Sequence, residues 1–116
     1  MENWYARPVF FVSNCEEAIK IYETLGFHEQ WSHSEDGKIM AIQMNLNGIE
    51  LILNENKPKA GGGRLFVSLE KGAVQKYLSK ILTDKVEIKD VFWGMPTKSI
   101  RDKDGNELLF YDDEMT

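Results

Sequence analysis

Short runs of alternating hydrophobic and polar residues fill most of this chain, and two longer stretches have the spacing of amphipathic helices. Residues 6–13 are rich in β-branched and aromatic side chains, which predicts a strand. In the next segment, apolar residues at i, i+3, i+4 and i+7 predict a helix with one buried face: Ala18, Ile21, Tyr22 and Leu25. The segment Ser13-Asn14 can cap this helix, and Gly26 can end it.

Three antiparallel strands are predicted after this helix, over residues 27–34, 39–46 and 49–53. The dipeptides Asp36-Gly37 and Asn47-Gly48 lie between them and are typical of tight hairpin turns. The first half of the chain is therefore expected to be a strand, a helix and three strands.

The same unit comes back in the second half. Phe11, Val12, Ser13, Ala18 and Tyr22 each have an identical residue 55 positions later: Phe66, Val67, Ser68, Ala73 and Tyr77. A displacement of about half the chain indicates one supersecondary unit used twice. The second unit is predicted as a strand, a helix and three strands over residues 64–69, 73–82, 86–92, 97–101 and 107–111.

The two units are expected to form a single domain over residues 1–116. Their bounds are about 5–55 and 63–113, and the run Gly61–Gly63 between them has the composition of a flexible linker. A glycine-rich phosphate-binding loop would follow a strand and open a helix. This run precedes a strand, which favours a linker.

Composition and charge exclude several classes of partner. A net charge of −5 argues against a nucleic-acid partner, because such proteins concentrate Lys and Arg on one face. No apolar run long enough for a membrane helix is present, and the single cysteine, Cys15, cannot form an internal disulfide. We therefore expect a cytoplasmic protein with no membrane or nucleic-acid partner.

Two joined βαβββ units predict an α+β fold, in which both helices cover the outside of a concave eight-stranded mixed sheet that encloses a cleft. Here the chain resembles the vicinal-oxygen-chelate superfamily of glyoxalases, bleomycin-resistance proteins and extradiol dioxygenases. The most specific motifs are segments 7–12, 17–22 and 25–27, the hairpin Arg101-Asp102-Lys103-Asp104-Gly105-Asn106, and Trp93-Gly94. Lys103 stands where the family usually has proline.

The resemblance implies four metal-ligand positions, one on the first and last strand of each half. They fall on Arg7, Glu50, Arg64 and Leu109, of which only Glu50 is a ligand residue. Glu107 lies two residues before Leu109, about 6.6 Å along the strand, which we judge too far to replace it. One carboxylate is too few for a catalytic metal site, so no cofactor is expected.

Without a metal, Arg7 and Arg64 are expected to bracket Glu50 from equivalent places at the lips of one cleft. This cluster has two open interpretations, a structural ion cluster or a set of ligand contacts. Strand alternation adds side chains that should line the concave face: Val9, Phe11, Ile52, Asn54, Phe66, Ser68, Leu109 and Tyr111. Trp93 either caps the core or stacks on a ligand.

The favoured hypothesis is a metal-free protein of the bleomycin-resistance type that sequesters a drug- or metabolite-like ligand, either aromatic or cationic. The expected ligand contacts are Arg7, Phe11, Glu50, Ile52, Arg64, Phe66, Trp93, Leu109 and Tyr111, and no catalytic residue is expected. The resemblance also implies a homodimer. The alternatives are a metal-dependent lyase or dioxygenase with a rearranged ligand set around Glu50, and a protein-interaction module.

Overall fold

The structure is a computed structural model that describes residues 2–81 and 84–116. The elements of the first half are β1 (Val9–Val12), α1 (Cys15–Thr24), β2 (His28–Glu35), β3 (Lys38–Leu46), β4 (Ile49–Glu55) and the 3-10 helix η1 (Lys57–Lys59). Those of the second half are β5 (Arg64–Ser68), α2 (Ala73–Leu78), β6 (Glu87–Phe92), β7 (Pro96–Arg101), β8 (Glu107–Tyr111) and the 3-10 helix η2 (Asp113–Met115). This order confirms the two predicted βαβββ units.

Two elements are shorter than predicted. β1 begins at Val9, and the Pro8 carbonyl just before it accepts from Ile52 N on β4 at 3.0 Å. α2 ends at Leu78, where the Ser79 hydroxyl turns back onto the Lys76 carbonyl at 2.7 Å. Leu82, the predicted end of this helix, lies outside the described residues.

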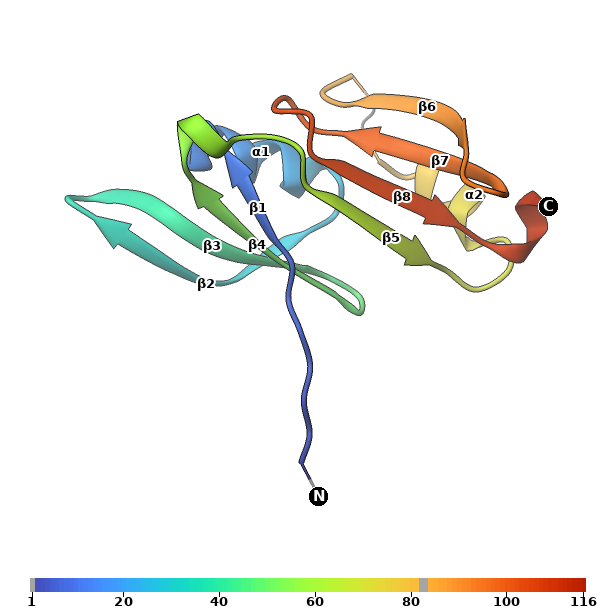
Figure 1. The fold of residues 1–116 in the computed structure, drawn as a ribbon, viewed down its shortest axis with the longest axis horizontal. Coiled ribbons are helices and arrows are strands. Elements are labelled where there is room, and N and C mark those ends of the chain that lie inside the picture. The colour runs from blue at the N-terminus through green and yellow to red at the C-terminus, as the bar shows by residue number, and fades with distance from the viewer. Residues whose placement is uncertain (1, 82–83) are drawn as a thin grey trace.

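The eight strands form two four-stranded mixed sheets, in the orders β1-β4-β3-β2 and β5-β8-β7-β6. Figure 1 shows the sheets side by side, with α1 behind the first sheet and α2 behind the second. The first strand of each half is parallel to the last, and the remaining pairs are antiparallel. Val9 lies opposite Ile52 and Arg64 opposite Glu107, so the 55-residue displacement extends to the strand register.

The core lies between the sheets and their helices. Phe10, Val12, Leu51 and Leu53 turn one face of the first sheet toward α1, and all are essentially fully buried. Leu108 and Phe110 do the same beneath α2. Because side chains alternate along a strand, the opposite face of each sheet, which we call its open face, carries the intervening residues and is not covered by a helix. No helix in the described part of the chain is long and apolar enough to cross a bilayer.

The β7–β8 hairpin of the second half is fastened to the β1 edge of the first. The buried Asn106 side chain accepts from Gly63 N at 2.9 Å and donates to the Phe11 carbonyl at 2.9 Å and to Asp102 at 3.1 Å. Asp102 also accepts from the Tyr22 hydroxyl at 2.8 Å, and Asp104 accepts from Ser13 N at 3.1 Å. The hairpin motif therefore joins the two halves as well as turning the chain.

This close approach gives the glycines between the halves a steric role. Gly61 has a φ of +88°, and a Cβ at this position would lie 2.3 Å from the Asp104 carbonyl oxygen. A Cβ on Gly63 would lie 2.5 Å from the Phe10 ring and 2.7 Å from Asn106. Both positions require glycine because the hairpin packs directly on them.

Replacement of Asn106 by alanine should destabilise the whole chain. Three hydrogen bonds are lost, and the Gly63 N–H and Phe11 carbonyl lose a partner, so we expect a loss of about 3 kcal/mol in the free energy of unfolding. Urea titration followed by far-UV circular dichroism measures it. Asn56→Ala is the control, because that side chain caps only η1. An equal loss in both variants would contradict the bridging role of Asn106.

Candidate functional site

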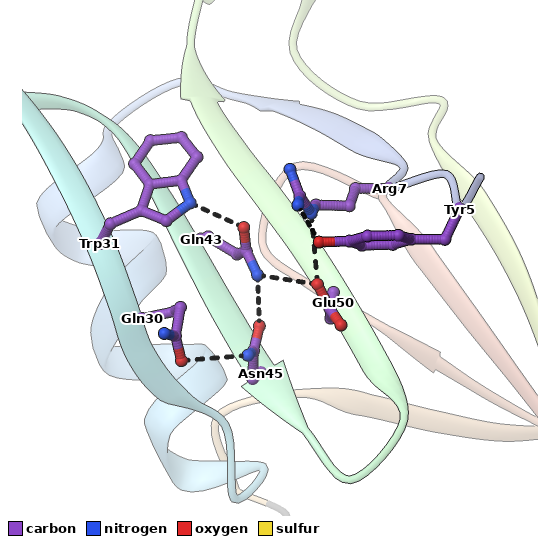
Figure 2. A network of polar contacts seen from close by, with 7 residues as sticks. All are labelled: Tyr5, Arg7, Gln30, Trp31, Gln43, Asn45 and Glu50. Atoms are coloured by element: carbon purple, nitrogen blue, oxygen red, sulfur yellow. Dashed lines mark hydrogen bonds and ion pairs between the residues drawn. The ribbon is translucent and has the colours of Figure 1, made fainter. Parts of the chain in front are cut away.

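A row of polar side chains crosses the open face of the first sheet from β1 to β2. We call this set the first-sheet row; its members are Tyr5, Arg7, Glu50, Gln43, Asn45, Gln30 and Trp31 (Figure 2). Tyr5 and Arg7 lie in the segment before β1. Glu50 belongs to β4, Gln43 and Asn45 to β3, and Gln30 and Trp31 to β2, so the row spans the sheet. Strand register explains the row, because Gln43 lies opposite Trp31 and Asn45 lies opposite Glu50.

Gln43 is the centre of the row and has only 3% of its surface exposed. Its amide nitrogen donates to Asn45 at 2.9 Å and to Glu50 Oε1 at 3.1 Å, and its oxygen accepts from the Trp31 indole N–H at 2.7 Å. The side-chain amide thus uses both donors and its acceptor, which fixes the orientation of all three neighbours.

An extra residue in β2 brings a further side chain to this row. The pairing with β3 shifts between Glu29 and Trp31, which leaves Gln30 as a β-bulge. Gln30 accepts from the Asn45 amide at 3.4 Å. A second shift leaves Met40 unpaired on β3, and its carbonyl accepts from Asn54 at 3.3 Å.

At the other end of the row, Arg7 and Glu50 form a half-exposed ion pair. Arg7 Nε lies 3.2 Å from Glu50 Oε1, and the two side chains are 36% and 35% exposed. Arg7 also donates to the Tyr5 hydroxyl. These bonds to Tyr5 and Glu50 raise the pKa of Arg7 further, so the guanidinium stays charged.

Arg64 does not join this pair, which corrects the expected three-residue cluster. It bonds instead to Glu107 Oε1, with Nε and Nη2 each at 2.9 Å. Arg64 lies directly opposite Glu107 in the β5–β8 register, whereas Glu50 belongs to the other sheet. Glu107 lies two residues before Leu109 on β8, and this same offset places it directly opposite Arg64.

The expected equivalence of Arg7 and Arg64 is also wrong. The repeat displacement of 55 places Arg64 at the position of Val9, two residues further along the strand than Arg7. Arg7 lies outside β1, in the extended segment that leads into it. The two arginines therefore form separate ion pairs in separate sheets.

The Glu107 carboxylate is closed off from solvent. Its side chain is 3% exposed, it accepts from the Ser99 hydroxyl, and Arg101 Nη2 lies 3.4 Å from Oε2. Burial alone would raise the pKa of this carboxyl, but the bonds from Ser99 and Arg64 and the charges of Arg101 and Arg64 outweigh burial and hold it below its ordinary value. This cluster braces β5, β8 and β7.

Aromatic side chains gather on the open face of the second sheet. The Phe66 ring stacks on Trp93 with centroids 6.1 Å apart and lies 6.3 Å from the Tyr111 ring. The Arg64 guanidinium lies over the Trp93 ring at 4.7 Å. Phe66 and Trp93 remain 37% and 44% exposed, so this aromatic group presents ring faces to solvent. Four of the predicted contact residues are brought together here.

A groove of about 1020 Å³ runs between the two halves. Its walls come from the segment before β1, the β3–β4 turn, β5 and α2. Of the predicted contact residues, Glu50 and Phe66 line it, so each open face contributes one of its residues to the groove. The rims carry Glu70, Lys76 and Lys80.

The remaining predicted contacts are less open. Phe11 is half-buried beneath the linker, with Lys59 Nζ 5.5 Å from its ring centroid, and Ile52 is half-buried between β1 and β3. Leu109 lies between Phe66 and Ser99 in the strand register and is completely buried, so within this chain it is not accessible to a ligand.

The four positions at which the family holds a metal do not fit one here. Arg7 and Arg64 are ion-paired guanidiniums without a lone pair, Leu109 is apolar, and Glu50 already binds Arg7 and Gln43. Within residues 2–81 and 84–116, no three His, Cys, Asp or Glu side chains are grouped as metal ligands. Burial raises the pKa of the Cys15 thiol to about 11, so this cysteine is a protonated core residue.

Several site residues were missed from the sequence. Gln43 and Asn45 alternate with the buried Ile42 and Met44, so strand parity could have placed them on the open face. Trp31 and Gln30 could not be placed in this way, because the bulge shifts their register. Ser99 and Arg101 become visible only once the β7–β8 register is known.

The Glu107 cluster should make stability depend on pH. Because its folded-state pKa is depressed, its contribution is present above the unfolded value of about 4.3 and is lost as pH falls through the folded value. Wild type should be more stable than Glu107→Gln at pH 7, and this difference should shrink below about pH 4.3. Urea unfolding at a series of pH values measures it, and a difference independent of pH would contradict the assignment.

Comparison with known proteins agrees with this geometry. A bleomycin-binding protein from Streptomyces verticillus complexed with copper(II)-bleomycin has a TM-score of 0.70 at 15% identity, covering 98% of this chain and 99% of that one. TnmS3, an antibiotic-binding protein from Streptomyces sp. CB03234, has a TM-score of 0.66 at 20% identity, covering 97% and 98%. A bleomycin-binding protein complexed with bleomycin has a TM-score of 0.69 at 16% identity, covering 97% and 100%.

At these identities the structures show a shared fold, and no curated protein is significantly similar in sequence. The family model for the Glyoxalase/Bleomycin resistance protein/Dioxygenase superfamily matches residues 4–110, nearly the whole chain. With its two βαβββ units and open sheet faces, this chain belongs to that superfamily.

Proposed function

We propose that this protein binds a drug- or metabolite-like small molecule and does so without a metal ion or catalytic step. The observation that carries the proposal is the position of Phe66, which lines the groove between the halves and stacks on Trp93 beside Tyr111. Apolar grooves with a few polar groups are the usual form of small-molecule sites. The proposal includes a cytoplasmic location, in keeping with a single, free and buried cysteine.

The aromatic group favours a planar or cationic ligand. Phe66 and Trp93 are partly exposed and can stack on a flat ring, and a cation can lie over a ring face, which carries the negative end of the aromatic quadrupole. Arg64 already occupies one position over Trp93 at 4.7 Å. A neutral aromatic ring can extend this stack without displacing the guanidinium. Similar structures bind bleomycin and other antibiotics, which makes such compounds suitable first probes.

Metal-free binding is supported by the donor set at the four family positions. Two of them carry guanidiniums that are committed to Glu50 and Glu107. The Arg64–Glu107 pair connects β5 to β8, and the Arg7–Glu50 pair connects the segment before β1 to β4, which would replace the cross-bracing that a metal provides in the family's enzymes. These ion pairs support a bracing role for Arg7 and Arg64, with the aromatic rings beside Arg64 left for the ligand.

Replacement of Trp93 by alanine should weaken ligand binding about tenfold, because a stacking face and its buried area are lost. Metal-free bleomycin, proflavine and 1-naphthamide are the probes, titrated by isothermal calorimetry. The control is Phe92→Ala, which removes a 74% exposed aromatic residue from the same strand end. Urea unfolding checks that both variants are folded. Binding of none of the probes to wild type, or equal loss in both variants, would overturn the proposal.

We also propose that two chains form a homodimer. The segment before β1 extends away from both sheets (Figure 1), and it carries Trp4 and Tyr5 with 85% and 69% of their surface exposed. On the β5 side of the pairing with β8, the odd-numbered residues make the backbone bonds, as in Glu107 N to Gly63 O and Leu69 N to Tyr111 O. The backbone N–H and C=O groups of Arg64, Phe66 and Ser68 therefore point away from β8, toward the outer edge of the sheet. An exposed aromatic segment and an open strand edge are both features that a second chain can cover.

Light scattering coupled to size-exclusion chromatography should give twice the chain mass of 13.4 kDa. Deletion of residues 2–6 should shift the protein toward the monomer, since the two exposed aromatic residues are removed. The double variant Lys57→Ala, Lys59→Ala in the exposed linker helix is the control and should remain dimeric. A monomeric wild type at all concentrations would overturn the dimer.

A further inference from the structure

The first-sheet row has unused hydrogen-bonding capacity, in contrast to the closed Glu107 cluster. Glu50 Oε1 accepts from both Arg7 and Gln43, whereas Oε2 has no hydrogen-bond partner among the described residues. Arg7 Nη1 and the Gln30 amide nitrogen also have no partner there. The Glu50 carboxylate is 35% exposed, so its free oxygen can be reached from solvent.

The charges in the row cancel. One guanidinium, Arg7, stands against one carboxylate, Glu50, and the other side chains are neutral amides, a phenol and an indole. A free acceptor beside free donors, with no net charge, matches a group that carries both an N–H and a C=O. Primary carboxamides, ureas and lactams are such groups. A ligand carboxylate could accept from Arg7, but it would face repulsion from Glu50 and has no N–H to donate to the free Glu50 oxygen.

Trp31 adds a flat surface beside these polar groups. Its indole ring is held by the 2.7 Å bond from its N–H to Gln43 Oε1 while 40% of the residue remains exposed. Gln43 is buried and fully bonded, so it is a rigid holder for this ring. Trp31 on β2 and Glu50 on β4 lie on either side of Gln43 on β3, so a planar ring that carries an amide is needed to stack on the indole while its amide group bonds to Glu50.

We propose that the first-sheet row is a subsite for a planar amide-type group of the ligand, with Trp31 and Glu50 in contact with it and Gln43 as the positioning residue. The inference rests on the proposed small-molecule function and specifies its ligand class. It places the amide-binding end on the first sheet, apart from the aromatic group of Phe66, Trp93 and Tyr111. Glu50 from the row and Phe66 from the aromatic group both line the groove between the halves.

The test compares 1-naphthamide with 1-naphthoate, which share one ring system and differ only in the amide or carboxylate group. Two-dimensional NMR of the ¹⁵N-labelled protein follows the indole N–H signals of Trp31 and Trp93, assigned with Trp31→Phe and Trp93→Phe. We expect 1-naphthamide to shift the Trp31 signal and to bind at least about threefold more tightly than 1-naphthoate, the difference of one net hydrogen bond.

Two variants isolate the row. Glu50→Gln should bring the two affinities together, because the repulsion of naphthoate and the charged acceptor are both lost, while Glu29→Gln on exposed β2 should leave the preference unchanged. Gln43→Met should move the Trp31 signal toward that of a solvent-exposed indole before any ligand is added, and should weaken naphthamide binding. A Gln43→Met signal that stays in place would overturn the positioning role.

The outcomes separate this inference from the proposed function. A response at Trp93 alone, or equal or tighter binding of naphthoate to wild type, would overturn the amide subsite and leave the aromatic site standing. No response at either tryptophan would overturn the subsite, and together with no binding of bleomycin or proflavine it would overturn the proposed function as well.

Discussion

The arrangement of the two sheets depends on a small set of hydrogen bonds around Asn106. Its side chain lies between Gly63, at the start of the second half, and the Phe11 carbonyl, on the edge of the first. The Phe11 carbonyl also accepts from Gly61 N at 3.1 Å, so groups from both the linker and the hairpin bond to the edge of β1 that faces away from β4. Buried polar groups of this kind are costly when unpaired, and the two halves must meet in one geometry to pair them all.

The groove between the halves follows from that geometry. The groove exists because β5 is held beside the β3–β4 turn, and its walls therefore come from both halves. The two sheets have kept the same register and have acquired different chemistry on it. The second sheet buries the carboxylate of its Arg–Glu pair beside Ser99 and Arg101, whereas the first leaves the Glu50 carboxylate partly exposed. In the second unit the carboxylate is used within the sheet, whereas in the first unit one carboxylate oxygen of Glu50 can be reached from solvent.

The fold was predictable from the sequence because its signals are local. The helix spacing in residues 18–25, the turn dipeptides and the 55-residue displacement each depend on residues close together or on simple repetition. The pairing of Arg64 was not predictable in the same way. It depends on which carboxylate lies opposite Arg64 in the β5–β8 pairing, and this pairing is between strands far apart in the sequence. The strand register also shows that Arg64 corresponds to Val9, two residues after Arg7. The row around Gln43 needed both strand parity and the bulge at Gln30, and only the first can be read from the sequence.

The bulge at Gln30 has a consequence beyond the placement of one side chain. β2 is the outermost strand of its sheet, all eight of its residues are exposed, and such a strand offers free backbone groups on which foreign chains can add. Gln30 on β2 and Met40 on the adjoining strand interrupt the regular spacing of those groups twice within eight residues. Bulges of this kind twist an edge strand and make it a poorer template for further strands, so the irregularity that places Trp31 is also a feature by which sheet edges avoid pairing with other chains.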